Sequence, residues 1–375
     1  MPWEEVTKMK SKLDFVRFSL EGLQPFSKLC KAFKISRKTG YKILHAYQLH
    51  GEDGLKEQSR RPHNSPRKTE LSIEDKVLAI RKRKPCWGGR KIRAILVNQN
   101  EKNVPACSTI TDILHRNNMI EQKSSISKLE NPQRFEHETP NDLWQADFKG
   151  HFATHKGRCH PLTIIDDHSR FSIGLRACDN ERGETVKKHF IDIFHEYGLP
   201  YRINFDNGTP WAAPHVRTYK FTEFSTWLIR LGIRVSFSRI RHPQTNGKDE
   251  RFHRTLKDEL LKYHYFWDIF DAQKHFDPWR DEYNFERPHE SLNMKPPISR
   301  YTISKRKYPK KLPEIEYSER DIIRKVDSSG MIYYKNKAYF ISESLKSMPV
   351  ALREWENGKF NVYFCNQKIR CIDIT

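Results

Sequence analysis

The stretch from residue 143 to residue 178, LWQADFKGHFATHKGRCHPLTIIDDHSRFSIGLRAC, decides the fold class of its domain. LWQADFKGHF alternates apolar and polar side chains, which predicts a strand, and HPLTIIDDHS and FSIGLRAC predict two more. Residues 183–263 then alternate between helical stripes and short strands and end in a long helix. Three strands followed by alternating helices and strands predict an α/β domain with a mixed sheet.

Three acidic residues of this domain occupy positions that suit a catalytic site. Asp147 lies in the middle of the first predicted strand, where a buried carboxylate is costly without a partner or a metal ion. Asp206 ends the strand YRINFDNG, and α/β sheets bind ligands at the carboxyl ends of strands. Glu250 lies in the first turns of the long helix. Each also has a structural interpretation, as an edge residue, a turn former before Asn207, or an i,i+4 partner of Arg254.

Other acids compete with these three. Asp166 and Asp167 end the second predicted strand, where they either shape a turn or pair with Arg170. Asp249 adjoins Glu250 and points about 100° away around the helix, so spacing cannot choose between the two.

Converging carboxylates on rigid elements suit phosphodiester chemistry. Two metal ions about 3.5–4 Å apart activate the attacking oxygen and stabilise the leaving one. Magnesium takes a few carboxylates and keeps other positions for water and phosphate oxygens. The chain contains no GxSxG, P-loop or GxGxxG motif, so no serine-triad or nucleotide-binding site is indicated.

We expect residues 1–50 to form a helix-turn-helix DNA-binding domain. Ser27 and Ser36 are predicted to cap two short helices that a tight connection joins. Three basic residues lie in the early turns of the second of these helices: Arg37, Lys38 and Lys42. An ordinary three-helix bundle with a basic surface is the alternative.

Residues 51–70 are rich in Gly, Pro and Arg, which predicts a basic linker. Its Arg60 and Arg61 either follow DNA phosphates or form a solvated charge run. Residues 71–121 predict a second helix-turn-helix domain, with a spacer bundle as the alternative, and residues 122–140 predict a second linker.

We place the catalytic core at residues 141–301 and a small β-barrel domain at residues 302–375. Short strand-like stretches with turn signals at Ser329-Gly330 and Asn357-Gly358 predict five strands there.

The composition favours a polyanionic partner. The formal net charge is +21, from 68 basic and 47 acidic residues, and each neutralised phosphate releases condensed counterions. Seven cysteines without a CxxC pair argue against a disulfide framework and a cysteine zinc site. The sequence shows no signal-peptide core and no stretch of 18 apolar residues, so we expect a soluble, cytoplasmic, nucleoid-associated protein without membrane contact.

Four motifs of the core resemble the D,D,E insertion-sequence transposases, which are relatives of retroviral integrases. They are WQADFKGHF with Asp147, LTIIDDHSRFSIG, FDNGTPW with Asp206, and IRVSFSRIRHPQTNGKDERFHRTLKDEL with Glu250. The most specific part is HPQTNGKxERFHRTLK. YNFERPHESLNMKPPISRY resembles the usual end of the core, and SRKTGYK with SRRPHNSP resembles the usual N-terminal part. The resemblance covers about residues 2–301 and, more weakly, the barrel.

The resemblance implies a ribonuclease-H-like core, which the predicted order of elements also fits. It implies that Asp147, Asp206 and Glu250 are the catalytic residues and that they bind two Mg²⁺ or Mn²⁺ ions. Basic residues next to the third acid are implied to contact DNA phosphates: Lys248, Arg251, Arg254 and Lys257.

The implied function is that of a DNA transposase, a metal-dependent polynucleotidyl transferase. It would bind the ends of its mobile element, cleave them by hydrolysis and join the 3′-hydroxyl to target DNA, with no covalent protein–DNA intermediate. Two ends must come together, so we expect a homodimer or tetramer on double-stranded DNA. The alternative is a catalytically silent DNA-binding regulator derived from a transposase, and a weaker one is a stand-alone nuclease.

One feature departs from the family pattern. Between Asp206 and Glu250 lie 43 residues, which is more than in most integrases. The excess falls in residues 211–222, either as a substrate contact or as a variable surface loop.

Overall fold

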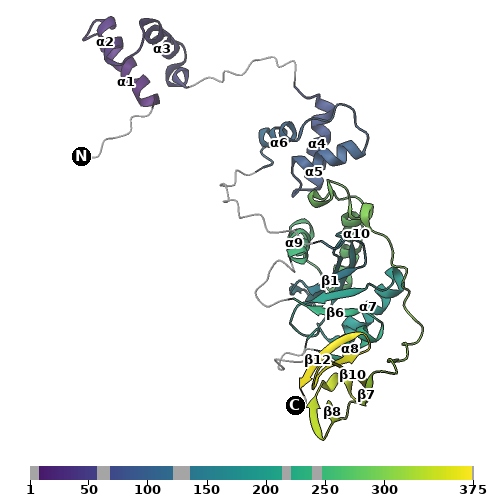
Figure 1. The fold of residues 1–375 in the computed structure, drawn as a ribbon. Helices are drawn as coiled ribbons and strands as arrows, with labels where there is room; N and C mark the ends of the chain where they lie inside the picture. Colours follow the sequence, from purple (N-terminus) through teal and green to yellow (C-terminus); the bar gives the residue numbers. More distant parts are fainter. Residues whose placement is uncertain (1–7, 57–67, 121–135, 213–220, 239–246, 374–375) are drawn as a thin grey trace. The chain divides into compact units, whose positions relative to one another are not determined.

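The computed structural model describes residues 8–56, 68–120, 136–212, 221–238 and 247–373 (Figure 1). The chain divides into two units, Met1–Lys68 and Thr69–Thr375, which are treated separately. In the described residues no helix is long and apolar enough to cross a membrane. All seven cysteines are free.

The first unit is a small helical domain. Its elements are α1 (Lys8–Glu21), α2 (Phe26–Ala32), α3 (Arg37–His50) and the 3₁₀ turn η1 (Gly51–Leu55). Phe15, Leu29 and Cys30 form its buried core. Gly40 lets α3 approach this core closely, because a Cβ there would lie 2.8 Å from the Cys30 sulfur. The helix–turn–helix arrangement of α2 and α3 is therefore present.

The start of α3 agrees with the predicted cap, whereas the start of α2 does not. The Ser36 hydroxyl accepts the Thr39 backbone N–H at 3.1 Å, as expected for an N-cap. The helix α2 begins at Phe26, after Pro25, and has no side-chain cap, so the prediction for Ser27 is wrong. Pro25 occupies the N-cap position, and its carbonyl accepts the backbone N–H groups of Lys28 and Leu29 at 2.8 and 3.2 Å, so Ser27 lies inside the helix.

A second helical bundle opens the other unit. It consists of α4 (Leu71–Arg83), α5 (Gly89–Asn98) and α6 (Cys107–Arg116). Fully buried apolar side chains from all three helices meet in one cluster: Val77, Ile92, Leu96, Ile110, Ile113 and Leu114. Trp87, in the turn between α4 and α5, joins this cluster and donates its indole N–H to Glu259 of the next domain at 3.1 Å.

The next domain is built on a mixed sheet. Its strands are β1 (Leu143–Phe148), β2 (Phe152–Thr154), β3 (Gly157–Asp166), β4 (Ser172–Cys178), β5 (Arg202–Phe205) and β6 (Arg234–Phe237). The order is β2-β3-β1-β5-β6, and β4 also pairs with β3. The strand β3 is antiparallel to β1 and β4, whereas β1, β5 and β6 run parallel. This is the mixed sheet that the sequence predicts.

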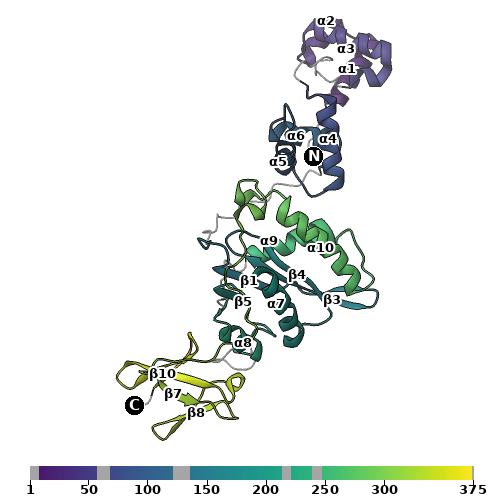
Figure 2. The same ribbon diagram turned by 90° about the vertical axis from the view of Figure 1, so that its right-hand side faces the viewer.

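Helices cover both faces of the sheet (Figure 2). On one face lie α7 (Gly183–Tyr197) and α8 (Glu223–Arg230). On the other lie α9 (Gly247–Leu256), the π-helical turn η3 (Lys257–Leu261) and α10 (Ile269–Phe285). Neighbouring residues of β3 point to opposite faces, so Ile164 belongs to the first core and Ile165 to the second. The layout is that of the ribonuclease-H-like core expected from the sequence.

The C-terminal residues form a small β domain. A four-stranded antiparallel sheet has the order β12-β11-β10-β7, and β8 pairs with β9 in a hairpin. The strands are β7 (Ile322–Lys325), β8 (Met331–Tyr334), β9 (Lys337–Phe340), β10 (Pro349–Glu356), β11 (Lys359–Phe364) and β12 (Gln367–Asp373). The strands predicted for a small five-stranded β-barrel are present, but the described residues form six strands, arranged as this four-stranded sheet and the separate hairpin. Its buried side chains join the α7–α8 core.

Candidate active site

Asp147 and Asp206 lie side by side because their strands are parallel neighbours. In the register of β1 and β5, Gln145 pairs with Asn204. Two residues further along each strand, the same register places Asp206 beside Asp147. Both carboxylates thus stand where β1 and β5 end, and both are half-buried.

Glu250 comes to this place from a different layer. It lies in the first turn of α9, on the α10 face of the sheet, and its side chain is exposed. Its negative charge nevertheless acts on Asp147 and helps to raise the pKa of that carboxyl. The structure therefore brings the three predicted acids to one region.

The electrostatics of Asp147 reflect this convergence. Burial is the main cause that raises its pKa, to about 7, and the neighbouring charges of Asp206, Glu181 and Glu250 raise it further. Burial also raises the pKa of Asp206. The Gly208 backbone N–H, which donates to Asp206 Oδ1 at 3.0 Å, lowers this pKa and so offsets part of the increase. Carboxylates that resist ionisation beside one another form a site where a cation relieves the repulsion.

Sequence reasoning missed Glu181. It follows β4, and its Oε1 lies 2.7 Å from His160 Nδ1. Its charge raises the pKa of both Asp147 and Asp206. A sequence signal for Glu181 is lacking, because its nearness depends on β4 pairing with β3, and β3 with β1.

Asp249 differs sharply from its neighbour. Its carboxyl is buried, its Oδ1 has no hydrogen-bond partner, and burial together with the charge of Asp147 raises its pKa well above the usual range. It therefore lies beneath the acids, whereas Glu250 lies at the solvent side. An exposed carboxylate suits ligation of a metal ion that also holds a phosphate oxygen and water.

Within the described ranges, no group of three or more His, Cys, Asp or Glu side chains stands close enough to hold a metal ion. The donor chemistry nonetheless fits a hard divalent cation, since Asp147, Asp206 and Glu250 supply carboxylate oxygens. The mutual repulsion of these carboxylates and the orphaned Oδ1 of Asp249 agree with a site that takes a positive charge.

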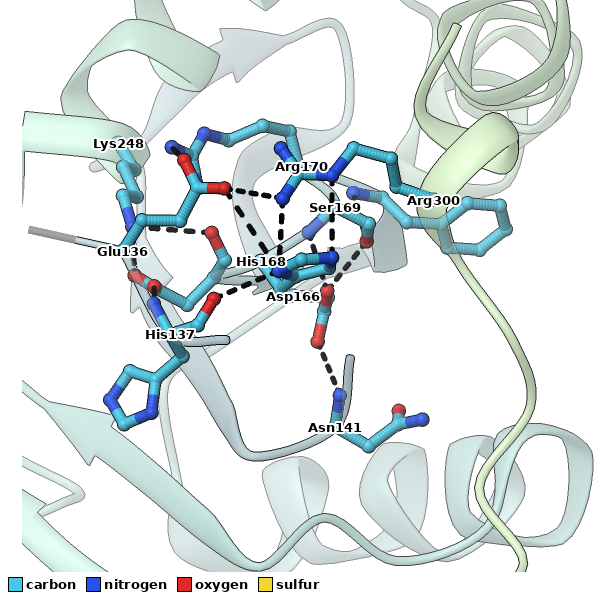
Figure 3. Close-up of polar contacts among 11 residues, drawn as sticks. Glu136, His137, Asn141, Asp166, His168, Ser169, Arg170, Lys248 and Arg300 are labelled. Atoms are coloured by element: carbon cyan, nitrogen blue, oxygen red, sulfur yellow. Dashed lines mark hydrogen bonds and ion pairs between the residues drawn. The ribbon is translucent and has the colours of Figure 1, made fainter. Parts of the chain in front are cut away.

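Asp166 organises the turn after β3 (Figure 3). It is fully buried and accepts the backbone N–H of Asn141 at 2.7 Å and that of Ser169 at 2.8 Å. The Ser169 hydroxyl adds a third hydrogen bond at 2.5 Å. The turn-forming prediction for Asp166 is confirmed. Arg170 pairs instead with Glu136, at 2.9 Å.

Asp167 is also buried but faces away from this turn. Its Oδ1 accepts the Gln145 side-chain N–H at 2.8 Å and forms an ion pair with Lys248 Nζ. Its Oδ2 accepts the backbone N–H of His137 at 2.9 Å. Asp167 lies in the turn after β3, as one of the two predictions has it, but the predicted pair with Arg170 is wrong, because these three groups take the Asp167 oxygens.

The predicted DNA-contacting residues fall into three groups. Arg37, Lys38 and Lys42 are exposed on the first turns of α3. Arg60 and Arg61 lie outside the described residues. The remaining four belong to α9 and η3: Arg251, Arg254 and Lys257 are exposed, whereas Lys248 is mostly buried against Asp167.

The lengthened segment after Asp206 begins in the core. Trp211 is buried and stacks on Phe205, with ring centroids 4.5 Å apart. Ala212 is buried too and pairs in an isolated bridge with Phe221. The two ends of the segment are thus anchored, and residues 213–220 lie outside the described part of the chain.

Comparison with known families agrees with this architecture. Two models described as integrase core domain match residues 137–243 and 231–297. A helix-turn-helix domain matches residues 11–63, and a homeodomain-like domain matches residues 39–114. The chain therefore has an integrase core preceded by helix-turn-helix domains.

Several curated relatives belong to insertion elements. A 39.2 kDa protein of insertion element IS476 from Xanthomonas euvesicatoria is 28% identical over 42% of this chain and 43% of the relative. The transposase of IS904 from Lactococcus lactis is 25% identical over 64% of this chain and 96% of the relative. The resemblance to insertion-sequence transposases with an integrase-like core is thereby confirmed. The matches span about half the length of the first curated relatives.

Among solved structures, the HTLV-2 integrase catalytic core domain in complex with magnesium is 19% identical, covers 44% of this chain and 97% of its own, and has a TM-score of 0.34. A chain of the simian T-cell lymphotropic virus intasome is 16% identical, covers 80% of this chain and 96% of its own, and has a TM-score of 0.38.

Proposed function

We propose that the protein is a DNA transposase that cleaves the ends of its mobile element and joins the freed 3′-hydroxyl to target DNA. The observation that supports this best is the parallel pairing of β1 and β5, which places Asp147 beside Asp206 where the two strands end, with Glu250 nearby on α9. The integrase core match and the relatives from insertion elements point to the same reaction class.

Asp147, Asp206 and Glu250 are the proposed ligands of divalent metal ions, Mg²⁺ or Mn²⁺, with two ions in the working site. When bound, such ions supply Lewis-acid activation of the phosphodiester and of the attacking oxygen. The carboxylates hold a fixed geometry because β1 and β5 are hydrogen-bonded neighbours. In the first step water attacks phosphorus and the 3′-oxygen leaves. In the second the 3′-hydroxyl attacks a target phosphodiester and another 3′-oxygen leaves.

Exposed cations next to Glu250 would hold the DNA backbone. Arg251, Arg254 and Lys257 lie on the same short stretch of helix and are solvent-facing. Arg251 also lines a cavity of about 580 Å³ beside α5 and α6. Each phosphate contact orients the strand at the acids without carrying sequence information. Ends would be recognised by the two helix-turn-helix domains, with Arg37, Lys38 and Lys42 on α3 as contacts.

We also propose the division into a helix-turn-helix domain at 1–50, a second at 71–121, a core at 141–301 and a β domain at 302–375. Two element ends must be joined to one target, so a dimer or tetramer on double-stranded DNA is the expected working form. The regulator alternative shares the DNA-binding parts and lacks the chemistry.

The test is a cleavage and joining assay with duplex DNA from the regions that flank the gene, with Mg²⁺ and with EDTA. Asp147→Asn, Asp206→Asn and Glu250→Gln are each expected to lower cleavage by at least about two orders of magnitude, while binding to end DNA persists. Glu223→Gln, an exposed acid on α8, is the matched control.

Three outcomes would contradict the proposal in different ways. A wild-type protein that binds ends but never cuts them is a regulator. Cutting without joined product indicates a nuclease. If Glu250→Gln cleaves DNA as well as the wild type and Asp249→Asn does not cleave, the third metal-binding acid is Asp249.

A further inference from the structure

Helix α9 is fastened to the sheet on both sides of Glu250. The first fastening is the ion pair between Lys248 and Asp167. Lys248 Nζ also donates to the Asp167 backbone carbonyl at 3.2 Å. Asp167 itself is 2% exposed and is held by Gln145 of β1 and the His137 backbone N–H, so it cannot turn away.

The second fastening runs through His253. Its Nε2 lies 2.8 Å from the Thr163 hydroxyl, and that hydroxyl donates to the Asp147 carbonyl at 3.0 Å. Because the one hydroxyl proton goes to the Asp147 carbonyl, the His253 ring must donate its Nε2–H to Thr163. Thr163 stands directly opposite Asp147 in the β1–β3 register.

The two fastenings determine where Glu250 can be. Lys248 and His253 lie five residues apart, which is about 7.5 Å along the helix axis, and Glu250 lies between them. One contact ties α9 to the end of β3, and the other ties it to the backbone of Asp147 itself. Two such contacts hold the backbone of α9 against rotation and sliding, so the Cα of Glu250 stays in place while its exposed side chain can turn toward Asp147.

The same contacts leave the Lys248 ammonium unsuited to bind a DNA phosphate. Its ammonium has little exposure and already has a buried counter-charge, unlike the exposed Arg251 and Arg254 on the same helix. Leaving Asp167 to reach a phosphate would strand a buried carboxylate, which is strongly unfavourable.

We propose that Lys248 and His253 are positioning residues that fix the helix carrying the third acid, and that Lys248 is not a DNA contact. This inference rests on the proposed function for its catalytic meaning. The Asp167–Lys248 pair sets the start of α9, and the His253–Thr163–Asp147 chain sets its distance from the first acid.

Lys248→Met and Asp167→Asn test the first fastening in the full-length protein. Both are expected to speed amide hydrogen exchange at residues 247–252 by at least about tenfold in metal-free buffer, because a buried pair is broken. Both should raise the Mn²⁺ concentration for half-maximal cleavage. Affinity for end DNA in EDTA and its salt slope should stay at the wild-type values. Lys248→Arg, which keeps the charge, should restore the exchange rates.

A phosphate contact predicts a different pattern. Lys248→Met would then reduce the salt slope of DNA binding by about 1, and Asp167→Asn would leave binding unchanged or stronger. That pattern overturns the inference. Lys262→Met, which breaks the exposed pair with Asp258, is the matched control and should change neither exchange at 247–252 nor cleavage.

His253→Gln and His253→Leu test the second fastening. The glutamine amide can still donate to Thr163, so it should keep most of the metal affinity, whereas leucine should lose it. Equal loss in both variants, or equal retention, refutes the role of this hydrogen bond. Hydrogen exchange and DNA binding do not depend on cleavage, so these readings remain decisive if the wild-type protein proves to be a regulator.

Discussion

Glu259 forms a buried ion pair, so removing its charge should cost stability. It lies in η3, where both of its carboxylate oxygens share the single Arg287 Nε–H, each at 3.0 Å, and its Oε1 accepts the Trp87 indole N–H at 3.1 Å. Lys91 Nζ is a further cation at 3.6 Å. The side chains of Glu259 and Arg287 are 10% and 9% exposed. The change Glu259→Gln keeps the volume and removes the charge.

The loss of stability in Glu259→Gln depends on which buried cation stays charged without its partner. Burial, followed by the charge of Arg287, lowers the pKa of Lys91 to about 8, so this residue can lose its proton when Glu259 is gone. Arg287 cannot, because a guanidinium stays charged in proteins. Breaking a buried pair by removing one partner costs 3–5 kcal/mol. With Lys91 able to neutralise, about 3 kcal/mol is expected.

The assay is hydrogen exchange of the Trp87 indole and of the amides in α5 and η3, with urea unfolding in parallel. A loss of about 3 kcal/mol corresponds to exchange faster by about two orders of magnitude where local opening governs it. Glu290→Gln is the matched control, because Glu290 and Arg90 are 3.6 Å apart and mostly exposed. An exposed pair is worth less than about 1 kcal/mol.

Equal exchange rates in Glu259→Gln and Glu290→Gln would refute this reasoning. They would mean that water screens Arg287 in solution, or that α4–α6 is not held to the core by Glu259.

Three further predictions concern pH, packing and salt. Burial lowers the pKa of His253 to about 4 from an ordinary value near 6.5, so the unfolded chain binds this proton first and stability falls as pH drops from about 6.5 to 4. Between pH 7 and 5, the free energy of unfolding measured in urea should therefore fall by up to about 2 kcal/mol more for the wild type than for His253→Gln. If this free energy depends on pH in the same way in both proteins, the prediction is wrong. Gly40→Ala should destabilise the first unit by about 1–3 kcal/mol in thermal unfolding, because the new Cβ would lie 2.8 Å from Cys30, whereas Gly183→Ala meets nothing within 4 Å and serves as control. Affinity for end DNA should fall steeply between 50 and 200 mM salt, and a nearly flat response in a filter or anisotropy titration would remove the basic surface as the source of binding.

Much of the fold could be predicted from the sequence. Periodicity placed the strands and helices of the core close to their positions in the structure, because the spacing of apolar side chains reflects which face of each element is buried. Sequence motifs alone mark Asp147, Asp206 and Glu250. Helix starts were less predictable, as at Ser27, which lies inside α2 because the helix begins one residue earlier, with Pro25 at the N-cap position.

Other features depended on contacts between residues far apart in the chain. Lys248 looked like another cation on a basic helix, and only the folded core shows that Asp167, 81 positions earlier, takes its charge. Glu181 carried no signal at all, and Asp249 could not be told from Glu250 by spacing.

The sequence by itself determined the kinds of elements, their order, the net charge and the acids that motifs mark. The tertiary structure alone decided which acids are neighbours and which cations are free. The physical reason is that secondary structure and motifs depend on local spacing, whereas strand register, burial and charge pairing arise from contacts between distant segments. Asp147 and Asp206 meet because β1 and β5 pair in parallel, and no local pattern encodes that pairing.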